Sequence, residues 1–193
     1  MRLRTYSMIA GLSYFVIFFA AIFANFFVIE SMLAAPLQSI QQDGLMVRLG
    51  ILAFLITVVF DVVVAWALYE LFKQHVLSVL STLFRMMHAA VMGVAIFALP
   101  IALQATTDQQ VLQQVEVFNT IWLIGLFFFG IHLLLLSRIV DAPKFIVLFL
   151  AIAGLMYIAD TVAHFILPNY ESYAAMFLLF VALPSVVGEM SLA

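Results

Sequence analysis

The feature that most limits how this chain can fold is an uncharged, strongly apolar run from Thr5 to Ile29, directly after the basic stretch Met1–Arg4. A helix of this length covers the ~30 Å hydrocarbon core of a bilayer. The alternative is a secretory signal peptide. Its apolar region would be shorter and would end at a small-residue cleavage site, and no such site precedes Asn25. The run therefore predicts a first transmembrane helix over residues 7–29.

The whole chain has the composition of a membrane domain, with 67% hydrophobic and 9% charged residues. A soluble domain carries about 25% charged residues, so the surface of this protein must face lipid. The absence of cysteine excludes disulfides, thiol chemistry and Cys-ligated metal or iron–sulfur centres. A net charge of −3, with scattered basic residues, argues against nucleic acid as a partner. We expect one all-α transmembrane domain over residues 1–193.

Charged or proline-containing stretches divide the chain into six apolar segments, which predict six transmembrane helices. The stretch Ser31–Val47 is predicted to be a loop with a short interfacial helix that Pro36 begins and Gly44 ends. A second loop is predicted over Thr106–Phe118, with one or two amphipathic turns and Asp108 as their N-cap. The expected spans are residues 7–29, 47–72, 76–104, 119–137, 144–167 and 172–193.

Basic residues are divided unevenly between the two ends of these spans. Five of the seven Lys and Arg residues fall on one side, and Arg48 alone lies on the other. Because Lys and Arg concentrate in cytoplasmic loops, this split predicts a multi-pass inner (plasma) membrane protein with both termini in the cytoplasm. The residues on the cytoplasmic side are Arg2, Arg4, Lys73, Arg138 and Lys144.

The most informative pair of charges lies in the hairpin formed by the second and third spans. Asp61 precedes Lys73 by the same number of residues as Arg85 follows it, which places both side chains about 18 Å from the turn at 1.5 Å per residue. This depth is near the middle of a bilayer, where unpaired charges are costly. We therefore predict that Asp61 contacts Arg85. A purely structural ion pair between two helices is an equally weighted interpretation.

Further polar residues recur at helical spacing and are predicted to face the interior of the bundle. Arg85 and His88 lie one turn apart, while Tyr157, Asp160 and His164 share one face of the fifth span. We expect these five residues to line a polar cavity in the middle and outer half of the bundle. A dry hydrogen-bonded cluster is the alternative. The candidate ligand-binding residues are Asp61, Arg85, His88, His132, Tyr157, Asp160, His164 and Glu189.

Metal-binding and haem-binding alternatives rest on the same residues. His88, Asp160 and His164 form a conceivable metal-ligand set, and His88 with His164 a less favoured bis-His haem site. The simpler interpretations are interhelical hydrogen bonds for His88 and His132, and an Asp160–His164 hydrogen bond at i,i+4 spacing. Asp61 and Asp160 occupy similar positions in the two halves of the chain, as in a transporter with inverted repeats. The sequence requires no cofactor.

Motifs for nucleophilic catalysis, zinc proteolysis and phosphate binding are missing from the sequence. The leading prediction is that the protein binds or translocates a small polar or amphiphilic ligand, an ion or a lipid headgroup. One alternative is a membrane-embedded enzyme, dependent on metal through His88, Asp160 and His164. The other is an accessory subunit that packs against a larger membrane complex. The expected partners are the lipid bilayer, a small ligand or lipid, and a further membrane protein.

Several short motifs, taken in order, resemble a bacterial membrane family known as domain-of-unknown-function family 4386. They include Phe84-Arg85, the segment from Gly125 to His132, the segment from Gly154 to Asp160, and Gly188-Glu189. The likeness covers nearly the whole chain and implies six helices, but it carries no activity. Chains of this family continue in apolar sequence beyond the Gly-Glu pair, which leaves open whether the natural chain extends past Ala193.

Overall fold

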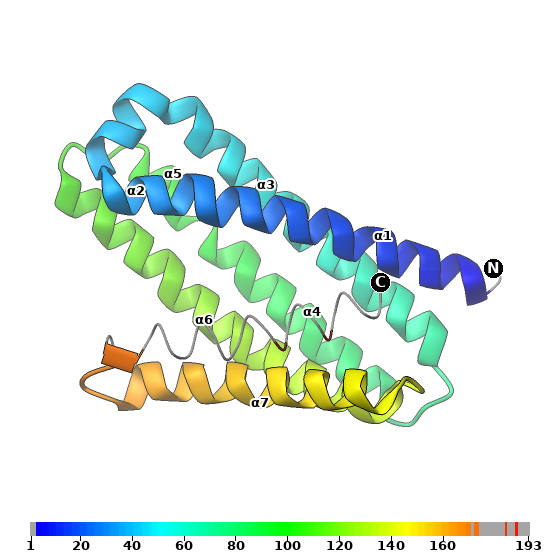
Figure 1. The fold of residues 1–193 in the computed structure, drawn as a ribbon. Helices are drawn as coiled ribbons and strands as arrows, with labels where there is room; N and C mark the ends of the chain where they lie inside the picture. The colour runs from blue at the N-terminus through cyan, green and yellow to red at the C-terminus, as the bar shows by residue number, and fades with distance from the viewer. Residues whose placement is uncertain (1–2, 171, 174–183, 185–187, 189–193) are drawn as a thin grey trace.

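The computed structural model describes residues 3–170, 172–173, 184 and 188. Every regular element in this part of the chain is a helix, as the predicted all-α class requires. The helices run side by side along one common direction (Figure 1). They are α1 (Leu3–Ile22), the π-helix η1 (Phe23–Ile29), α2 (Glu30–Ala34), α3 (Pro36–Phe72), α4 (Ser78–Ala95), α5 (Ala98–Ala102), α6 (Asp108–Ile139) and α7 (Lys144–Ile166).

Five helical segments among the described residues are long and apolar enough to cross a membrane: Leu3–Ala34, Pro36–Phe72, Ser78–Ala102, Asp108–Ile139 and Lys144–Ile166. Their outer faces carry large apolar side chains, such as Leu12, which is 66% exposed, and Phe97, which is 70% exposed. Such faces are stable only against lipid, so the protein is a multi-pass membrane protein. The predicted sixth span, residues 172–193, falls almost wholly outside the described residues.

The predicted loop over Ser31–Val47 is wrong, because this stretch is almost entirely helical. Only Ala35 interrupts it (φ −143°, ψ 72°), since a residue that precedes proline is disfavoured in the α conformation. Pro36 then begins α3, as predicted. Gly44 does not end that helix. The chain only kinks at Asp43 (φ −117°, ψ 29°) and continues to Phe72.

The predicted loop over Thr106–Phe118 is also wrong, since α6 begins at Asp108. Thr107, not Asp108, is the N-cap of this helix, and its Oγ1 accepts a hydrogen bond from Gln110 N at 3.3 Å. Asp108 instead accepts a hydrogen bond from the backbone N of Leu37 at 2.9 Å. Its carboxylate therefore satisfies a free N–H at the start of α3, which is the role of an N-cap supplied by another helix.

The predicted third span, 76–104, is divided into α4 and α5. Pro100 has no N–H and its ring clashes with the carbonyl four residues earlier, so a regular helix cannot pass through this point. The backbone tightens instead, and Leu99 N donates to Ile96 O at 3.1 Å. The fourth and fifth predicted spans coincide with the apolar parts of α6 and α7, and α3 ends at Phe72, where the second span was predicted to end.

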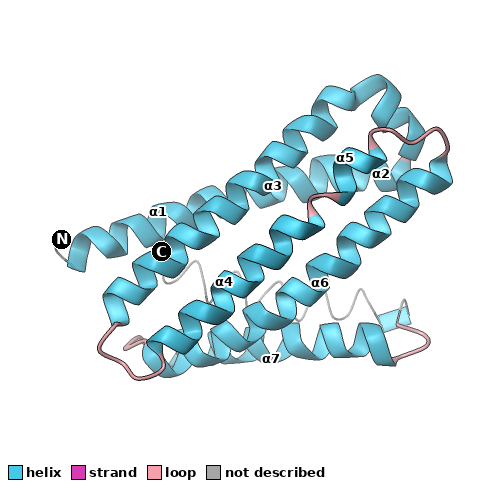
Figure 2. Ribbon diagram, turned by 180° about the vertical axis from the view of Figure 1, so that it is seen from behind, coloured by secondary structure: helices cyan, strands magenta, loops and turns pink. Residues whose placement is uncertain are grey.

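The lateral order of the helices decides which polar residues meet. The helix α1 packs on α3, α4 lies between α3 and α6, and α6 packs on α7. Figure 2 shows α4 and α6 side by side across the middle of the bundle. One end of the bundle, here called the 73–77 end, holds the start of α1, the turn 73–77 and the connection 140–143 (Figure 1). The opposite end, the 103–107 end, holds the α5–α6 connection.

Two apolar clusters fill the interior, one toward each end. Phe54, Leu99 and Phe118 belong to the cluster at the 103–107 end, and Leu68 and Leu136 to the cluster at the 73–77 end. The buried charged residues lie along the bundle between these two clusters. Apolar packing at both ends thus encloses a polar centre.

Candidate functional site

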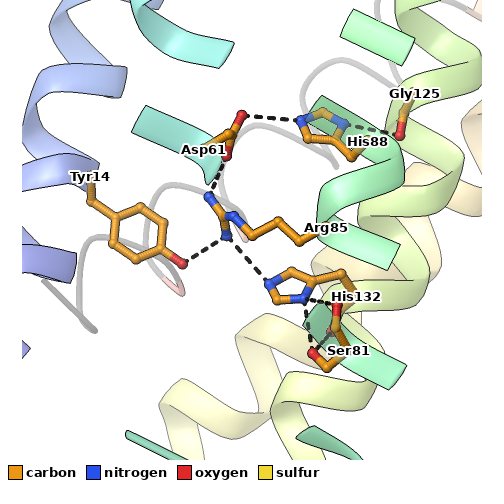
Figure 3. Close-up of polar contacts among 7 residues, drawn as sticks. All are labelled: Tyr14, Asp61, Ser81, Arg85, His88, Gly125 and His132. Atoms are coloured by element: carbon orange, nitrogen blue, oxygen red, sulfur yellow. Dashed lines mark hydrogen bonds and ion pairs between the residues drawn. The ribbon is translucent and has the colours of Figure 1, made fainter. Parts of the chain in front are cut away.

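The centre of the site is the ion pair between Asp61 of α3 and Arg85 of α4 (Figure 3). Arg85 Nη2 donates to Asp61 Oδ1 at 2.5 Å, so the contact predicted from their equal depth is confirmed. Arg85 is 1% exposed and Asp61 is 6% exposed. The turn of the hairpin that joins α3 and α4 lies far from this pair, at residues 73–77. There a hydrogen bond to half-buried Glu70 raises the pKa of exposed Lys73.

A histidine and a tyrosine complete the surroundings of the guanidinium. Arg85 Nη1 donates to Tyr14 Oη at 3.0 Å and to His132 Nε2 at 3.3 Å. Because arginine can only donate, Nε2 of His132 must be the unprotonated nitrogen. The proton is then on Nδ1, which lies 2.9 Å from Ser81 O and can donate to it. The contacts therefore fix His132 as the neutral Nδ1–H tautomer.

His88 lies on the other side of Asp61 and has a different proton requirement. Its Nδ1 is 3.0 Å from the carbonyl oxygen of Gly125, and its Nε2 is 3.5 Å from Asp61 Oδ2. Both neighbours are hydrogen-bond acceptors, while a neutral imidazole has one N–H and one lone pair. A neutral His88 would therefore turn a lone pair toward an oxygen. Only the doubly protonated ring donates to both.

Phe129 of α6 is the apolar base on which these side chains pack. Its ring centre lies 4.6 Å from the ring centre of His88 and 5.8 Å from that of His132. The Arg85 guanidinium carbon is 5.2 Å from the Phe129 ring centre and 5.1 Å from that of Tyr14. Two aromatic rings at this distance stabilise a buried cation through their π faces, so Arg85 has support beyond Asp61.

A second polar group is formed by residues of α7 and the turn after it. Tyr170 Oη donates to Asp160 Oδ1 at 2.7 Å. The ring of His164 lies edge-on to that of Tyr170, with 4.8 Å between ring centres. Tyr157, also on α7, contacts Phe129 edge-on at 5.5 Å between ring centres. This group lies toward the 103–107 end.

The sequence predicted a single cavity that extends from Arg85 and His88 to Asp160 and His164. This prediction is wrong. The helix α6 lies between α4 and α7, and the partners of His88 come from α3 and α6. No three His, Asp or Glu side chains among the described residues are placed to hold a metal ion. The metal-ligand set of His88, Asp160 and His164 is not assembled, nor is the haem pair. Glu189 lies outside the described residues.

The comparisons with known proteins agree with the motifs in the sequence. The model of a family described as domain of unknown function (DUF4386) matches residues 9–193. The chain belongs to this family. Neither curated proteins nor solved structures gave a significant match.

The motifs that resemble DUF4386 meet at two places in the fold. Arg85 of Phe84-Arg85 contacts His132, which ends the Gly125–His132 motif. That motif also contacts the Gly154–Asp160 motif, because Gly130 and Gly154 lie against each other where α6 crosses α7. An added Cβ at Gly130 would lie 2.6 Å from Gly154 O, so only glycine allows these DUF4386 helices to approach this closely.

Sequence reasoning missed three residues of the site around Asp61 and Arg85, namely Tyr14, Ser81 and Phe129. Tyr14 of the first helix was not among the predicted site residues, yet it is 3% exposed and accepts a hydrogen bond from Arg85. Its place beside Ser13, within a long apolar run, was the available signal. Ser81 lies one turn before Arg85 on the same helix, and its partner His132 comes from α6. Nothing distinguished Phe129 from the neighbouring phenylalanines, because its role depends on the packing of α6.

Proposed function

We propose that the protein is an ion-binding protein of the inner membrane and that its ion is the proton, bound between Asp61 and His88. The observation that carries this proposal is the pair of acceptors around His88, the Asp61 carboxylate and the Gly125 carbonyl. With one proton added, Nδ1 donates to the Gly125 carbonyl and the charged ring forms an ion pair with the Asp61 carboxylate. Without it, an acceptor faces an acceptor inside a low-dielectric bundle, which is a costly contact.

The other polar groups of the cluster have no comparable place for a second proton. Nε2 of His132 already accepts a hydrogen bond from the Arg85 cation, so a proton there would replace that bond with a like-charge contact. Asp61 Oδ1 is held by Arg85. The cavity that borders the cluster, beside Ser81 and His132, has a volume of about 10 Å³. That is room for about one water and favours a proton over a lipid headgroup.

The proposal includes six spans with both termini in the cytoplasm. Arg4, Lys73, Arg138 and Lys144 all belong to the 73–77 end (Figure 1), and this cluster supports a cytoplasmic position for that end. Gly188 lies against Leu150, in the first half of α7. A sixth span antiparallel to α7 would bring Gly188 to Leu150. The contact between these two residues therefore supports the sixth span.

The state of the histidines gives the direct test. The chain has four histidines, so ¹⁵N-histidine labelling of the protein in nanodiscs gives few signals. We expect both nitrogens of His88 to be protonated, and only Nδ1 of His132. His88→Gln should remove the doubly protonated signal, while His75→Gln, in the turn 73–77, serves as the matched control that leaves it in place. A singly protonated His88 would contradict the proposal.

Orientation is testable independently because the chain has no cysteine of its own. A single cysteine at Gln109, at the start of α6, should react with an impermeant thiol reagent added outside the cell. A cysteine at Asp141, in the connection between α6 and α7, should react only after the membrane is opened. Both positions are exposed. Labelling of the Gln109 variant solely from the cytoplasm would overturn the proposed orientation.

A further inference from the structure

The interior of the bundle contains a small cavity on the 73–77 side of the ion pair, lined by apolar as well as polar side chains. It lies between α3, α4 and α6, has a volume of about 10 Å³ and includes Ser78, Ser81, Thr82 and His132 in its lining. This volume accommodates about one water, and a buried water needs two to four polar partners. The hydroxyl groups of Ser78, Ser81 and Thr82 supply them. Phe72 and Ser78, which flank the turn 73–77, also border the cavity, so it opens toward that end.

A continuous series of polar contacts leads from this cavity to His88 (Figure 3). Ser81 contacts His132 Nδ1 at 2.9 Å, and His132 Nε2 accepts from Arg85 Nη1 at 3.3 Å. Arg85 Nη2 then donates to Asp61 Oδ1 at 2.5 Å. Asp61 Oδ2 is 3.5 Å from His88 Nε2. Among the described residues, every path along these contacts from the cavity to His88 includes the Arg85 guanidinium.

A guanidinium is an unusual member of such a series because it cannot give up a proton inside a protein. It therefore interrupts proton transfer between the groups on its two sides. Its positive charge also repels a proton that arrives at His132, in the way that a pore arginine excludes protons. The groups that face His88 or the ion pair are Tyr14 from α1, Asp61 from α3, Arg85 from α4 and His132 from α6.

We propose that Arg85 is a proton gate between a one-water site at Ser81 and His132 and the proton site at Asp61 and His88. Protons from the 73–77 end reach the water beside His132 freely, and they reach His88 only when Arg85 leaves Asp61. This inference rests on the proposed function, because it assigns the route by which that site exchanges its proton. Arg85 acts here as a positioning residue and a barrier, and it binds no substrate.

The experiment measures the contact of each histidine with water. Protein labelled with ¹⁵N-histidine is placed in liposomes of phosphatidylethanolamine and phosphatidylglycerol, and transfer of magnetisation from water and deuterium exchange are recorded for each ring N–H. In the wild type we expect His132 to receive magnetisation from water and His88 to exchange slowly. In Arg85→Gln, exchange at His88 should rise to the rate of His132. Arg85→Lys, which keeps the positive charge, should remain slow.

The wild-type measurement decides the proposal even where Arg85→Gln does not fold. A His132 without water contact, or a His88 that exchanges as fast as His132, overturns the gate. Slow exchange at His88 in a folded Arg85→Gln protein overturns it as well. The ¹⁵N shifts in the same spectra report whether His88 is doubly protonated. A doubly protonated but fast-exchanging His88 therefore rejects the gate alone, whereas a singly protonated His88 rejects the proposed function.

Discussion

Asp61→Asn and Arg85→Gln are each expected to lower the free energy of unfolding by about 3–5 kcal/mol, because each leaves a buried charge without its counter-charge. Asp61→Asn should be the more harmful of the two. The Asp61 carboxylate faces both Arg85 and His88, so its loss leaves two cationic groups within one buried cluster. Arg85→Gln leaves an anion that still faces His88. Thermal and denaturant unfolding in detergent would measure both changes.

The double variant Asp61→Asn, Arg85→Gln should lose far less than the sum of the two single losses, because neither the carboxylate nor the guanidinium is then buried without the other. The partly exposed pair Glu70 and Lys73, with 3.0 Å between Glu70 Oε2 and Lys73 Nζ, offers the matched control. Solvent screens that pair, so the same cycle there should show little coupling. Additive losses at Asp61 and Arg85 would contradict the view that the two charges stabilise each other.

The second large effect is expected where α6 crosses α7. An alanine at Gly130 would place its Cβ 2.6 Å from Gly154 O and 2.9 Å from Ile158. A backbone carbonyl cannot move aside as a flexible side chain can, so the two helices must separate. We expect Gly130→Ala to cost about 3 kcal/mol, at the upper end of the usual range for overpacking, and to lower the melting temperature in detergent.

Gly93→Ala is the matched control for this prediction. Gly93 is also in the interior of a membrane-spanning helix, but the nearest atom to its added Cβ is 4.0 Å away, on Val58. Alanine is a better helix former than glycine by about 1 kcal/mol, so this variant should be as stable as the wild type or slightly more so. Equal melting temperatures for the Gly93 and Gly130 variants would show that the α6–α7 crossing tolerates a side chain.

The ends of the helices show where sequence reasoning was limited. Polar residues over Ser31–Val47 and Thr106–Phe118 indicated loops, yet both stretches are mainly helical. A helix does not have to end where the apolar core of the membrane ends. Asp108 illustrates the difficulty. It was predicted to be the N-cap of its own helix, a role that Thr107 has instead, and it caps α3, whose start is brought to it by the fold.

The candidate site was predicted in part. Asp61, Arg85, His88 and His132 do meet at the centre of the bundle. Asp160 and His164 were placed in the same cavity because they share an inward face with Tyr157, but in the structure they belong to a separate group around Tyr170. The inward direction of a residue is a property of its own helix. Its neighbours depend on which helix is packed alongside.

The sequence by itself determined how deep each polar residue lies. Depth follows from the helical rise of 1.5 Å per residue and the position of the turn, and this was enough to pair Asp61 with Arg85. Only the tertiary structure decided the lateral order of the helices. That order depends on where the surfaces of two helices can approach each other closely. Gly125 allows such an approach beside His88, and Gly130 allows one beside Gly154. These contacts place α6 between α4 and α7, and so bring His132 to Arg85 and separate His164 from His88.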